Sequence, residues 1–358
     1  MESLEPDPLL QPERAPGRRR LFTFLKISIT VAGLVLVFQS LDLQTILSVI
    51  GKVDIMWMAI GAILMALSLV IRAYRWHLLI KGAGSSIRFR RLVELYLVGS
   101  FFNSFLPSGL GGDIVRATEA AQDVESSVAV STVLVDRLTG LMALFAMALF
   151  VLPFRPASFP NGLAATIVLI CIMGLFSGFV LVDGRLFHLF IRAMPSKFRR
   201  MGDNFFERLA TSIQNCGGST LAGALLVSVV FNLVQVGWWA STGRALALEI
   251  PFSYYVLIVP MMSLALLVPS IGGLGVRENL APILFNGAGI SPAQAVALTL
   301  LVFGLERVAS LLGAPVYLYS SLRGARRSNQ PDGAPAHHDR ATVIDDRFQV
   351  TCFFKCLG

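Results

Sequence analysis

Long apolar runs separated by short polar connections are the feature that most constrains this chain. Several runs reach about twenty residues, the length that an α-helix needs to cross the hydrocarbon core of a bilayer. Hydrophobic residues make up 55% of the 358 residues and charged residues only 15%, which lies outside the usual balance of soluble proteins. The sequence therefore predicts an all-α polytopic membrane protein.

The positively charged residues lie in clusters between or beside the apolar runs. Cytoplasmic loops of membrane proteins are enriched in Lys and Arg, so the clusters at 18–20, 72–91 and 185–208 are expected in the cytoplasm. Both termini then also lie there, as in a multi-pass protein of the cell inner (plasma) membrane. The net charge of +8 is explained by this orientation, and no nucleic-acid partner is expected.

The chain divides into three parts. Residues 1–20 are expected to form a cytoplasmic basic tail, residues 21–325 an integral membrane domain, and residues 326–358 a disordered polar tail. None of the four cysteines forms a CxxC pair, and the lone His337-His338 pair is a weak metal signal. No metal and no cofactor are therefore predicted.

Six apolar runs are long enough to cross a membrane completely. Two others, 92–106 and 254–268, are only about fifteen residues long, which is short for a span. Each of these two leads directly into a glycine-rich motif, so we expect two glycine-broken re-entrant hairpins beside about six full transmembrane helices. The alternative is eight full spans, but only the re-entrant topology keeps every strongly basic cluster in the cytoplasm. The six full spans are predicted at 21–41, 55–80, 127–152, 163–182, 221–239 and 292–322.

The two glycine motifs share their ingredients and their order. In each, proline and glycines break the apolar run, and an acid and an arginine follow within a few residues. The hairpin-breaking residues are Pro107, Gly109, Gly111 and Gly112 in the first motif and Pro269, Gly272, Gly273 and Gly275 in the second. The charged residues are Asp113 and Arg116 in the first, and Arg277 and Glu278 in the second.

Each motif is followed, in a later span, by an adjacent acid and base: Asp136-Arg137 and Glu306-Arg307. In the re-entrant topology the first motif enters from the cytoplasm and the second from outside. This layout predicts an inverted repeat with half-repeats at about 55–152 and 221–322, the arrangement by which many transporters build two alternating gates around one site.

The chemistry of these motifs favours an anionic ligand. Glycines at a helix break leave backbone N–H groups free for an anion, and arginine offers a planar fork for phosphate or carboxylate. Arg116 and Arg277 are therefore candidates for contacting a lipid headgroup, with Asp113 and Glu278 orienting them or contacting an amine. The alternative is that each acid simply pairs with its own arginine to hold the hairpin together.

Asp136, Arg137, Glu306 and Arg307 lie inside predicted spans, where each charge costs about 2.5 to 3.5 kcal/mol on insertion scales. They are expected either to pair with the arginines of the hairpins or to line a hydrophilic path. Some further polar residues are secondary candidates. Arg72 and Arg75 are interpreted as snorkelling cytoplasmic anchors, with a headgroup role as the alternative. Asn103 and Asn279, like Asn232 and Gln235, are expected to form hydrogen bonds between helices.

Common catalytic and nucleotide-binding patterns are absent from the sequence. There is no GxxxxGK[ST] loop, the glycine motifs do not follow a strand, and no nucleophile, base and orienter set is evident. An ATP-driven pump or a metalloenzyme is therefore not expected.

The ordered motifs resemble the integral-membrane region of the lysylphosphatidylglycerol synthase family, also called flippase-like membrane proteins. The resemblance covers about residues 20–325. It rests on Asn103-x3-Pro107-x3-Gly111-Gly112-Asp113-x2-Arg116, on Asp136-Arg137 and on Pro269-x2-Gly272-Gly273-Leu274-Gly275-x2-Glu278.

The resemblance implies a lipid-translocating domain, which full-length members join to a soluble aminoacyl-transferase domain. Such a domain is not expected in the polar segment after 325, so synthase activity is not predicted. We expect a lipid flippase-like transporter or lipid-handling protein that acts on an anionic or amine-bearing headgroup by alternating access. The alternatives are an accessory protein of glycolipid, isoprenoid-lipid or hopanoid biosynthesis, which would contact lipid-biosynthesis enzymes, and a structural scaffold.

Overall fold

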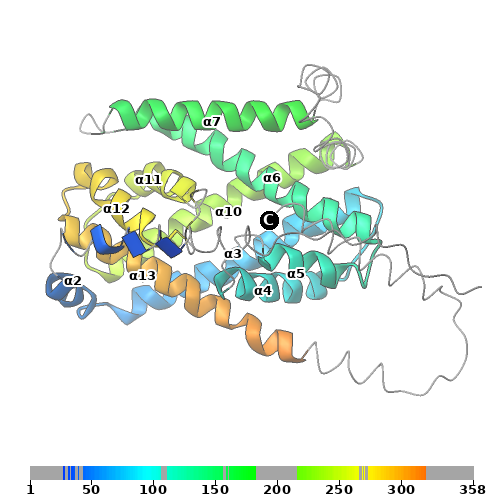
Figure 1. The fold of residues 1–358 in the computed structure, drawn as a ribbon, viewed down its shortest axis with the longest axis horizontal. Helices are drawn as coiled ribbons and strands as arrows, with labels where there is room; N and C mark the ends of the chain where they lie inside the picture. Colours follow the sequence, from blue (N-terminus) through cyan, green and yellow to red (C-terminus); the bar gives the residue numbers. More distant parts are fainter. Residues whose placement is uncertain are drawn as a thin grey trace, which may run out of the picture.

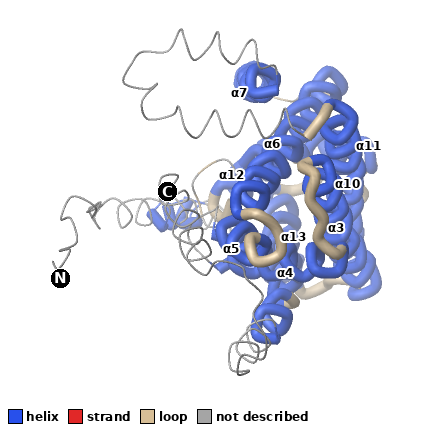
Figure 2. Tube along the Cα trace, turned by 90° about the vertical axis from the view of Figure 1, so that its right-hand side faces the viewer, coloured by secondary structure: helices blue, strands red, loops and turns tan. Residues whose placement is uncertain are grey.

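The computed structural model describes residues 43–105, 111–155, 159, 161–182, 216–265, 268, 270 and 273–319, together with parts of 27–39. These described residues form helices and turns and contain no strand. Five of the helices are long and apolar enough to cross a membrane, and an all-α polytopic membrane fold is therefore confirmed (Figures 1 and 2). They are Ile55–Gly82, Ser126–Phe154, Ala164–Leu181, Gly218–Ala245 and Pro292–Tyr319.

These five helices coincide with five of the six predicted spans. The sixth, at 21–41, lies mostly outside the described residues, and its membrane crossing stays a prediction. The tails at 1–20 and 326–358 and the basic loop at 185–208 also lie outside the described residues.

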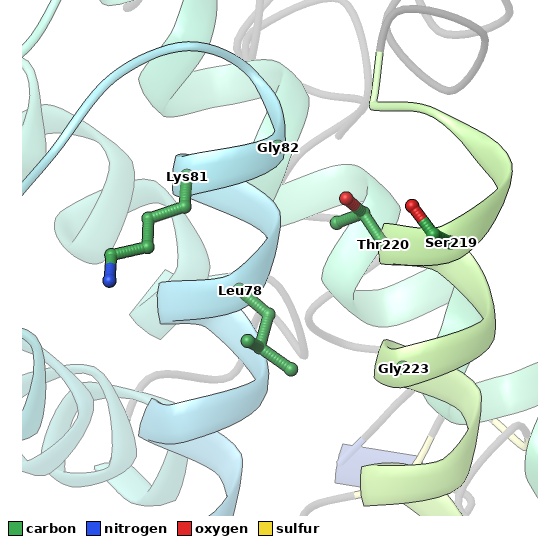
Figure 3. Close-up of a pocket in the computed structure, with 6 residues that line it drawn as sticks. All are labelled: Leu78, Lys81, Gly82, Ser219, Thr220 and Gly223. Atoms are coloured by element: carbon green, nitrogen blue, oxygen red, sulfur yellow. The ribbon is translucent and has the colours of Figure 1, made fainter.

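Two antiparallel helices of 28 residues each, α3 (Ile55–Gly82) and α10 (Gly218–Ala245), form the centre of the fold (Figure 1). Small residues line the contact between them, as is common between membrane helices. A Cβ on Gly61 would contact Thr242 at 3.7 Å, and a Cβ on Gly82 would lie 2.6 Å from the methyl group of Thr220. A pocket of about 270 Å³ remains between the end of α3 and the start of α10, beside Lys81 (Figure 3).

The first helical hairpin consists of α4 (Phe89–Phe105) and α5 (Gly111–Ala120). Arg91, near the start of α4, forms ion pairs of 3.1 Å with Glu119 in the last turn of α5 and of 3.2 Å with Asp123 just after it, so the two helices are antiparallel. A Cβ on Gly112 would overlap the carbonyl oxygen of Gly99, which explains why α5 begins with glycine.

The second hairpin consists of α11 (Phe252–Leu264) and α12 (Val276–Leu284). The Tyr254 hydroxyl, at the start of α11, donates a 2.8 Å hydrogen bond to the carbonyl oxygen of Leu284 at the end of α12. Gly273 and Gly275 both have a φ of 82°, a left-handed conformation that favours glycine. The other predicted helix breakers, Pro107, Gly109, Pro269 and Gly272, lie outside the described residues.

The returning helices of both hairpins are short. α5 has 10 residues and α12 has 9. At 1.5 Å per residue they are about 15 and 14 Å long, about half the thickness of a hydrocarbon core. The choice between re-entrant hairpins and eight full spans depends on where these helices lie in the membrane, and it stays a prediction.

The remaining helices surround the central pair and the hairpins. Helix α6 (Ser126–Val151) packs against α3, α5 and α10, and α13 (Pro292–Leu311) packs against α12 and α2 (Leu43–Ile50). Helix α7 (Asn161–Val182) lies at the edge of the bundle beside α6 (Figures 1 and 2). Short 3-10 turns, Leu152–Phe154 and Asn286–Ala288, extend α6 and follow α12. The interior that results contains a group of charged side chains.

Candidate functional site

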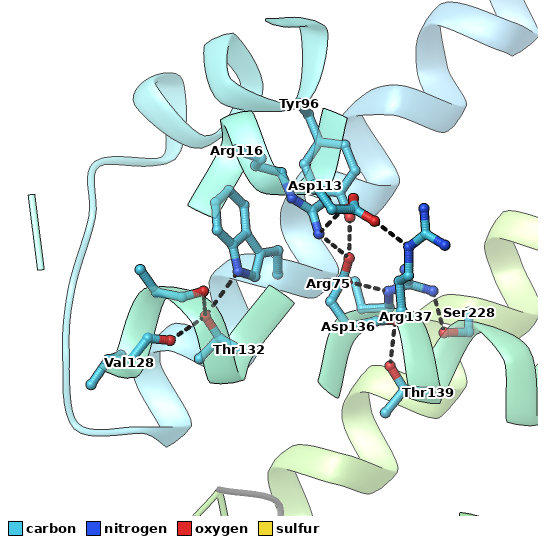
Figure 4. A network of polar contacts seen from close by, with 12 residues as sticks. Arg75, Tyr96, Asp113, Arg116, Val128, Thr132, Asp136, Arg137, Thr139 and Ser228 are labelled. Atoms are coloured by element: carbon cyan, nitrogen blue, oxygen red, sulfur yellow. Dashed lines mark hydrogen bonds and ion pairs between the residues drawn. The ribbon is translucent and has the colours of Figure 1, made fainter. Parts of the chain in front are cut away.

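Asp136 on α6 is the centre of a buried polar cluster (Figure 4). Its Oδ1 lies 2.7 Å from Nε of Arg75, and its Oδ2 lies 3.1 Å from Nη2 of Arg116. The Tyr96 hydroxyl also donates a hydrogen bond to Oδ2. The Asp136 side chain is only 2% exposed, so this one carboxylate ties together α3, α4, α5 and α6.

Arg75 lies inside the bundle and connects three helices. Besides its bond to Asp136, its Nη1 donates a 2.9 Å hydrogen bond to the Ser228 hydroxyl on α10. Gly140 on α6 leaves room for the guanidinium group, because a Cβ there would lie 2.7 Å from Nη1. The interpretation of Arg75 as a snorkelling surface anchor is therefore wrong, since buried partners on α6 and α10 satisfy its charge.

The guanidinium group of Arg116 lies between two aromatic rings. Its central carbon is 4.6 Å from the ring centroid of Trp76 and 4.2 Å from that of Tyr96. The Trp76 indole N–H donates in turn to the Thr132 hydroxyl at 3.1 Å, which fixes the ring. Cation-π contacts of this kind contribute about 0.5 to 2 kcal/mol, so the rings and Asp136 together hold Arg116 in one position.

Asp113 pairs with the arginine of its own motif, which was one of the predicted alternatives, and also with an arginine of α6, which was not predicted. Its Oδ1 lies 3.7 Å from Nη2 of Arg116 on its own helix, and its Oδ2 pairs with Nε of Arg137 on α6. The Arg137 side chain is 46% exposed, in contrast to the buried Arg75 and Arg116. The cluster therefore has a buried end at Asp136 and a more open end at Arg137.

Arg72 is the third arginine that α3 and α5 bring to the cluster. Its guanidinium carbon lies 5.7 Å from the ring centroid of Tyr96 and 5.3 Å from that of Phe231. The buried Nε atoms of Arg72 and Arg116 have no hydrogen-bond partner among the described residues. Donors with unused hydrogen-bonding capacity therefore lie within this cluster.

A second cluster joins α12 to α13. Nη1 of Arg277 lies 3.1 Å from Oε2 of Glu306, and the Arg277 side chain is 1% exposed. The neighbouring Glu278 accepts a 2.7 Å hydrogen bond from the backbone N–H of Gly275, and the Asn279 amide donates to the carbonyl oxygen of Gly275. Glu278 and Asn279 thus cap the start of α12.

The two clusters correspond to each other in arrangement. In each, the returning helix of a hairpin supplies an arginine that pairs at 3.1 Å with an acid of the next long helix, Arg116 with Asp136 and Arg277 with Glu306. Pairing between hairpin arginines and intramembrane acids was one of the two predicted arrangements. The correspondence agrees with a repeat, and the opposite orientation of its halves stays a prediction.

Two predicted polar residues act at the tip of the first hairpin. Oδ1 of Asn103 accepts a 2.9 Å hydrogen bond from the backbone N–H of Gly112, so it closes the hairpin. Arg307 on α13 donates from Nη1 to the carbonyl oxygen of Ser104 at 3.0 Å. These contacts connect the second half of the chain to the first hairpin.

Sequence reasoning missed Tyr96 and Ser228 and treated Trp76 only as an interfacial anchor. Tyr96 lies in an apolar segment, and Ser228 in a predicted span, so neither stood out. The one available signal was spacing: Arg72, Arg75 and Trp76 recur at helical intervals and share one face of α3. Within the described ranges, no group of three or more His, Cys, Asp or Glu side chains is arranged to hold a metal ion.

Comparison with known proteins agrees with this architecture. Residues 23–313 match the family model described as the lysylphosphatidylglycerol synthase TM region. UPF0104 membrane protein PH1989 of Pyrococcus horikoshii is 24% identical over 316 residues, which cover 78% of this chain and 91% of that protein. UPF0104 membrane protein MJ1595 of Methanocaldococcus jannaschii is 30% identical over 142 residues, which cover 36% of this chain and 42% of that protein.

Proposed function

This chain belongs to the lysylphosphatidylglycerol synthase TM region family, and from that premise we propose that it is a flippase-like transporter of membrane lipids. Its substrate carries an anionic headgroup, which binds at the cluster around Asp136. The acyl or isoprenoid tails stay in the bilayer while the headgroup passes between the two hairpins.

The arginine-rich composition of the cluster carries this proposal. Asp136 is shared by Arg75 and Arg116, while Arg72 stacks on aromatic rings beside them. Arg72, Arg75, Arg116 and Arg137 contribute four positive charges and Asp113 and Asp136 two negative charges, so these six residues have a formal net charge of +2. Charge inside a membrane requires a counter-charge, and a phosphate is an anion that guanidinium donors bind strongly.

Alternating access is proposed from the arrangement of the halves. The contact between Arg307 and the carbonyl oxygen of Ser104 joins the two halves at the tip of the first hairpin. A headgroup moving past this tip requires the contact to break and form again. The corresponding pair of Arg277 and Glu306 stabilises the second hairpin in the same way that Arg116 and Asp136 stabilise the first.

Reconstitution into proteoliposomes tests the proposal. Fluorescent phosphatidylglycerol, phosphatidylcholine and a glycolipid are placed in one leaflet, and their appearance in the other is followed with a membrane-impermeant quencher. We expect protein-dependent movement of an anionic lipid, and slower movement in Arg72→Gln. Arg90→Gln is the matched control, because the Arg90 side chain is 90% exposed and pairs only at the surface with Glu94.

Two results would redirect the proposal. If no lipid crosses faster with protein than without it, the transporter is excluded. If anionic lipids bind without crossing, and a lipid-biosynthesis enzyme depends on the chain for its activity, the chain is an accessory protein of lipid assembly.

A further inference from the structure

A groove of about 390 Å³ lies between α6 and α7. Four residues of α6 and four of α7 line it, and their side chains are almost entirely hydrocarbon or thioether. The one hydroxyl group, that of Ser177, already donates a 2.8 Å hydrogen bond to the carbonyl oxygen of Gly174 on its own helix. The groove therefore offers an apolar surface without unmet hydrogen-bonding groups.

Close contacts between the two helices form the floor of the groove. The ring of Phe145 occupies the space beside Gly174, and the thioether of Met142 occupies the space beside Gly178. Since 145 faces 174 and 142 faces 178, the helices are antiparallel. Ser177 therefore lies nearer the Leu138 end of the groove, and Ile170 lies nearer the Phe145 end.

Helix α7 lies at the edge of the bundle beside α6 (Figure 2), so the groove between these two helices is at the periphery of the bundle. Several large apolar side chains of α7 are exposed, among them Leu169, Phe176 and Phe179. In a membrane this surface faces the hydrocarbon of the bilayer, so a lipid chain can enter the groove laterally without crossing a polar region.

The groove also begins next to the charged cluster. Helix α6 contributes Asp136 and Arg137 to the cluster. The next residue, Leu138, lines the groove. Leu141, another lining residue, lies one turn from Arg137 and on nearly the same helix face. The half-exposed arginine thus stands at one end of an apolar path about 10 Å long, the helix length from Leu138 to Phe145.

We propose that this groove binds the hydrocarbon chain of a lipid whose phosphate meets Arg137 at the open end of the cluster. A positive charge followed by an apolar path matches the order of groups in an anionic lipid. The volume lies within the range of ligand pockets in proteins, about 300 to 1,000 Å³. This inference rests on the proposed function, because it assigns a binding position to the chain of the same lipid.

Photolabelling tests the groove directly. The intact protein is reconstituted into phosphatidylcholine vesicles containing a little phosphatidylglycerol with a diazirine in its acyl chain, and labelled peptides are mapped by mass spectrometry. We expect labelling within 138–145 and 170–177. Ser177→Trp fills the groove and should reduce this labelling about tenfold, the change expected when about two methylene groups lose their contacts.

Ile172→Trp is the matched control, since Ile172 is on the same helix, is 53% exposed and does not line the groove. It should leave the labelling unchanged. Arg137→Gln should reduce labelling by the phosphatidylglycerol probe but not by a diacylglycerol probe with the same chain.

Three outcomes would overturn the proposal: labelling spread evenly over the exposed face of α7, equal effects of the two tryptophans, or equal effects of Arg137→Gln on both probes. Efficient disulfide linkage of two Ser177→Cys chains would show instead that a second copy of the protein covers the groove. The translocation assay is separate. If the groove is labelled but no lipid moves, the transporter is excluded and the binding groove is supported. If lipid moves but the groove is not labelled, the transporter is supported and the binding groove is excluded.

Discussion

Arg307 on α13 donates a 3.0 Å hydrogen bond to the main-chain carbonyl oxygen of Ser104 on α4. The two residues are 203 positions apart, and the acceptor belongs to the last turn of its helix, where carbonyl groups have no intrahelical partner. A cation at this end also complements the helix dipole. The contact therefore fixes the tip of the first hairpin against the second half of the chain.

Arg307→Ala should loosen the tip of the first hairpin. A hydrogen bond to a charged group contributes about 1.5 to 3 kcal/mol, so amide exchange at 101–105 should become at least about tenfold faster. Hydrogen exchange with mass spectrometry measures this. Ser104→Ala is the control, because the acceptor is a main-chain oxygen that alanine retains; equal acceleration in both variants would contradict the assignment.

Asp136→Asn should strongly destabilise the protein. It removes the negative charge that Arg75 and Arg116 share and replaces one acceptor oxygen by an amide that cannot accept. Both guanidinium groups stay buried, and breaking a buried ion pair typically costs about 3 to 5 kcal/mol. Thermal unfolding in detergent reports the change. Glu94→Gln breaks only surface pairs, for which a loss within about 1 kcal/mol is expected. Similar unfolding temperatures for the two variants would show that Asp136 is not a structural centre.

Tyr96→Phe separates the two contributions of Tyr96. The ring that stacks on Arg116 stays, while the hydroxyl that donates to Asp136 is lost. Because a hydrogen bond to a charged group contributes about 1.5 to 3 kcal/mol, the variant should be less stable than the wild type but more stable than Asp136→Asn. The same unfolding measurement checks this order, and a loss as large as that of Asp136→Asn would contradict it.

Gly112→Ala should disrupt the first hairpin. The added methyl group would overlap the carbonyl oxygen of Gly99 and the side-chain amide of Asn103, so the helices must separate. Overpacking of this kind costs about 1 to 3 kcal/mol. Gly304→Ala is the control, since a Cβ at Gly304 meets nothing within 4 Å. The Gly304→Ala variant should be neutral or slightly stabilised, because alanine favours helices. Unfolding temperatures measure both variants, and a lower value for Gly304→Ala than for Gly112→Ala would contradict the prediction.

Glu278 substitutions distinguish a cap from a charge with another role. Glutamine retains a carbonyl oxygen that can accept from the backbone N–H of Gly275, whereas alanine removes the acceptor. We expect Glu278→Ala to lose about 0.5 to 2 kcal/mol and Glu278→Gln to keep both stability and lipid movement. If glutamine preserves stability but abolishes movement of lipid, the carboxylate has a function beyond capping.

Several parts of the site followed from sequence because their causes are local. The lengths of the apolar runs predicted the five described spans, and the glycines at 273 and 275 marked a backbone that requires a left-handed conformation. Charges inside spans required partners, and Arg116 with Asp136 was among the pairs expected. Arg75 was misinterpreted because its partner Asp136 lies 61 residues away, and only the packing of α3 on α6 makes it one.

By itself, then, the sequence determined that this chain is a helical membrane protein of a particular family, with two glycine-broken segments and a small set of intramembrane charges. The length of an apolar run and the backbone freedom of a glycine are properties of single segments, so they can be determined from the sequence of each segment alone. Only the tertiary structure decided that Asp136 is shared by two arginines, that Tyr96 and Ser228 complete the cluster, and that a groove begins beside Arg137. These features depend on which helix faces meet, and that is set by the packing of side chains distant in sequence.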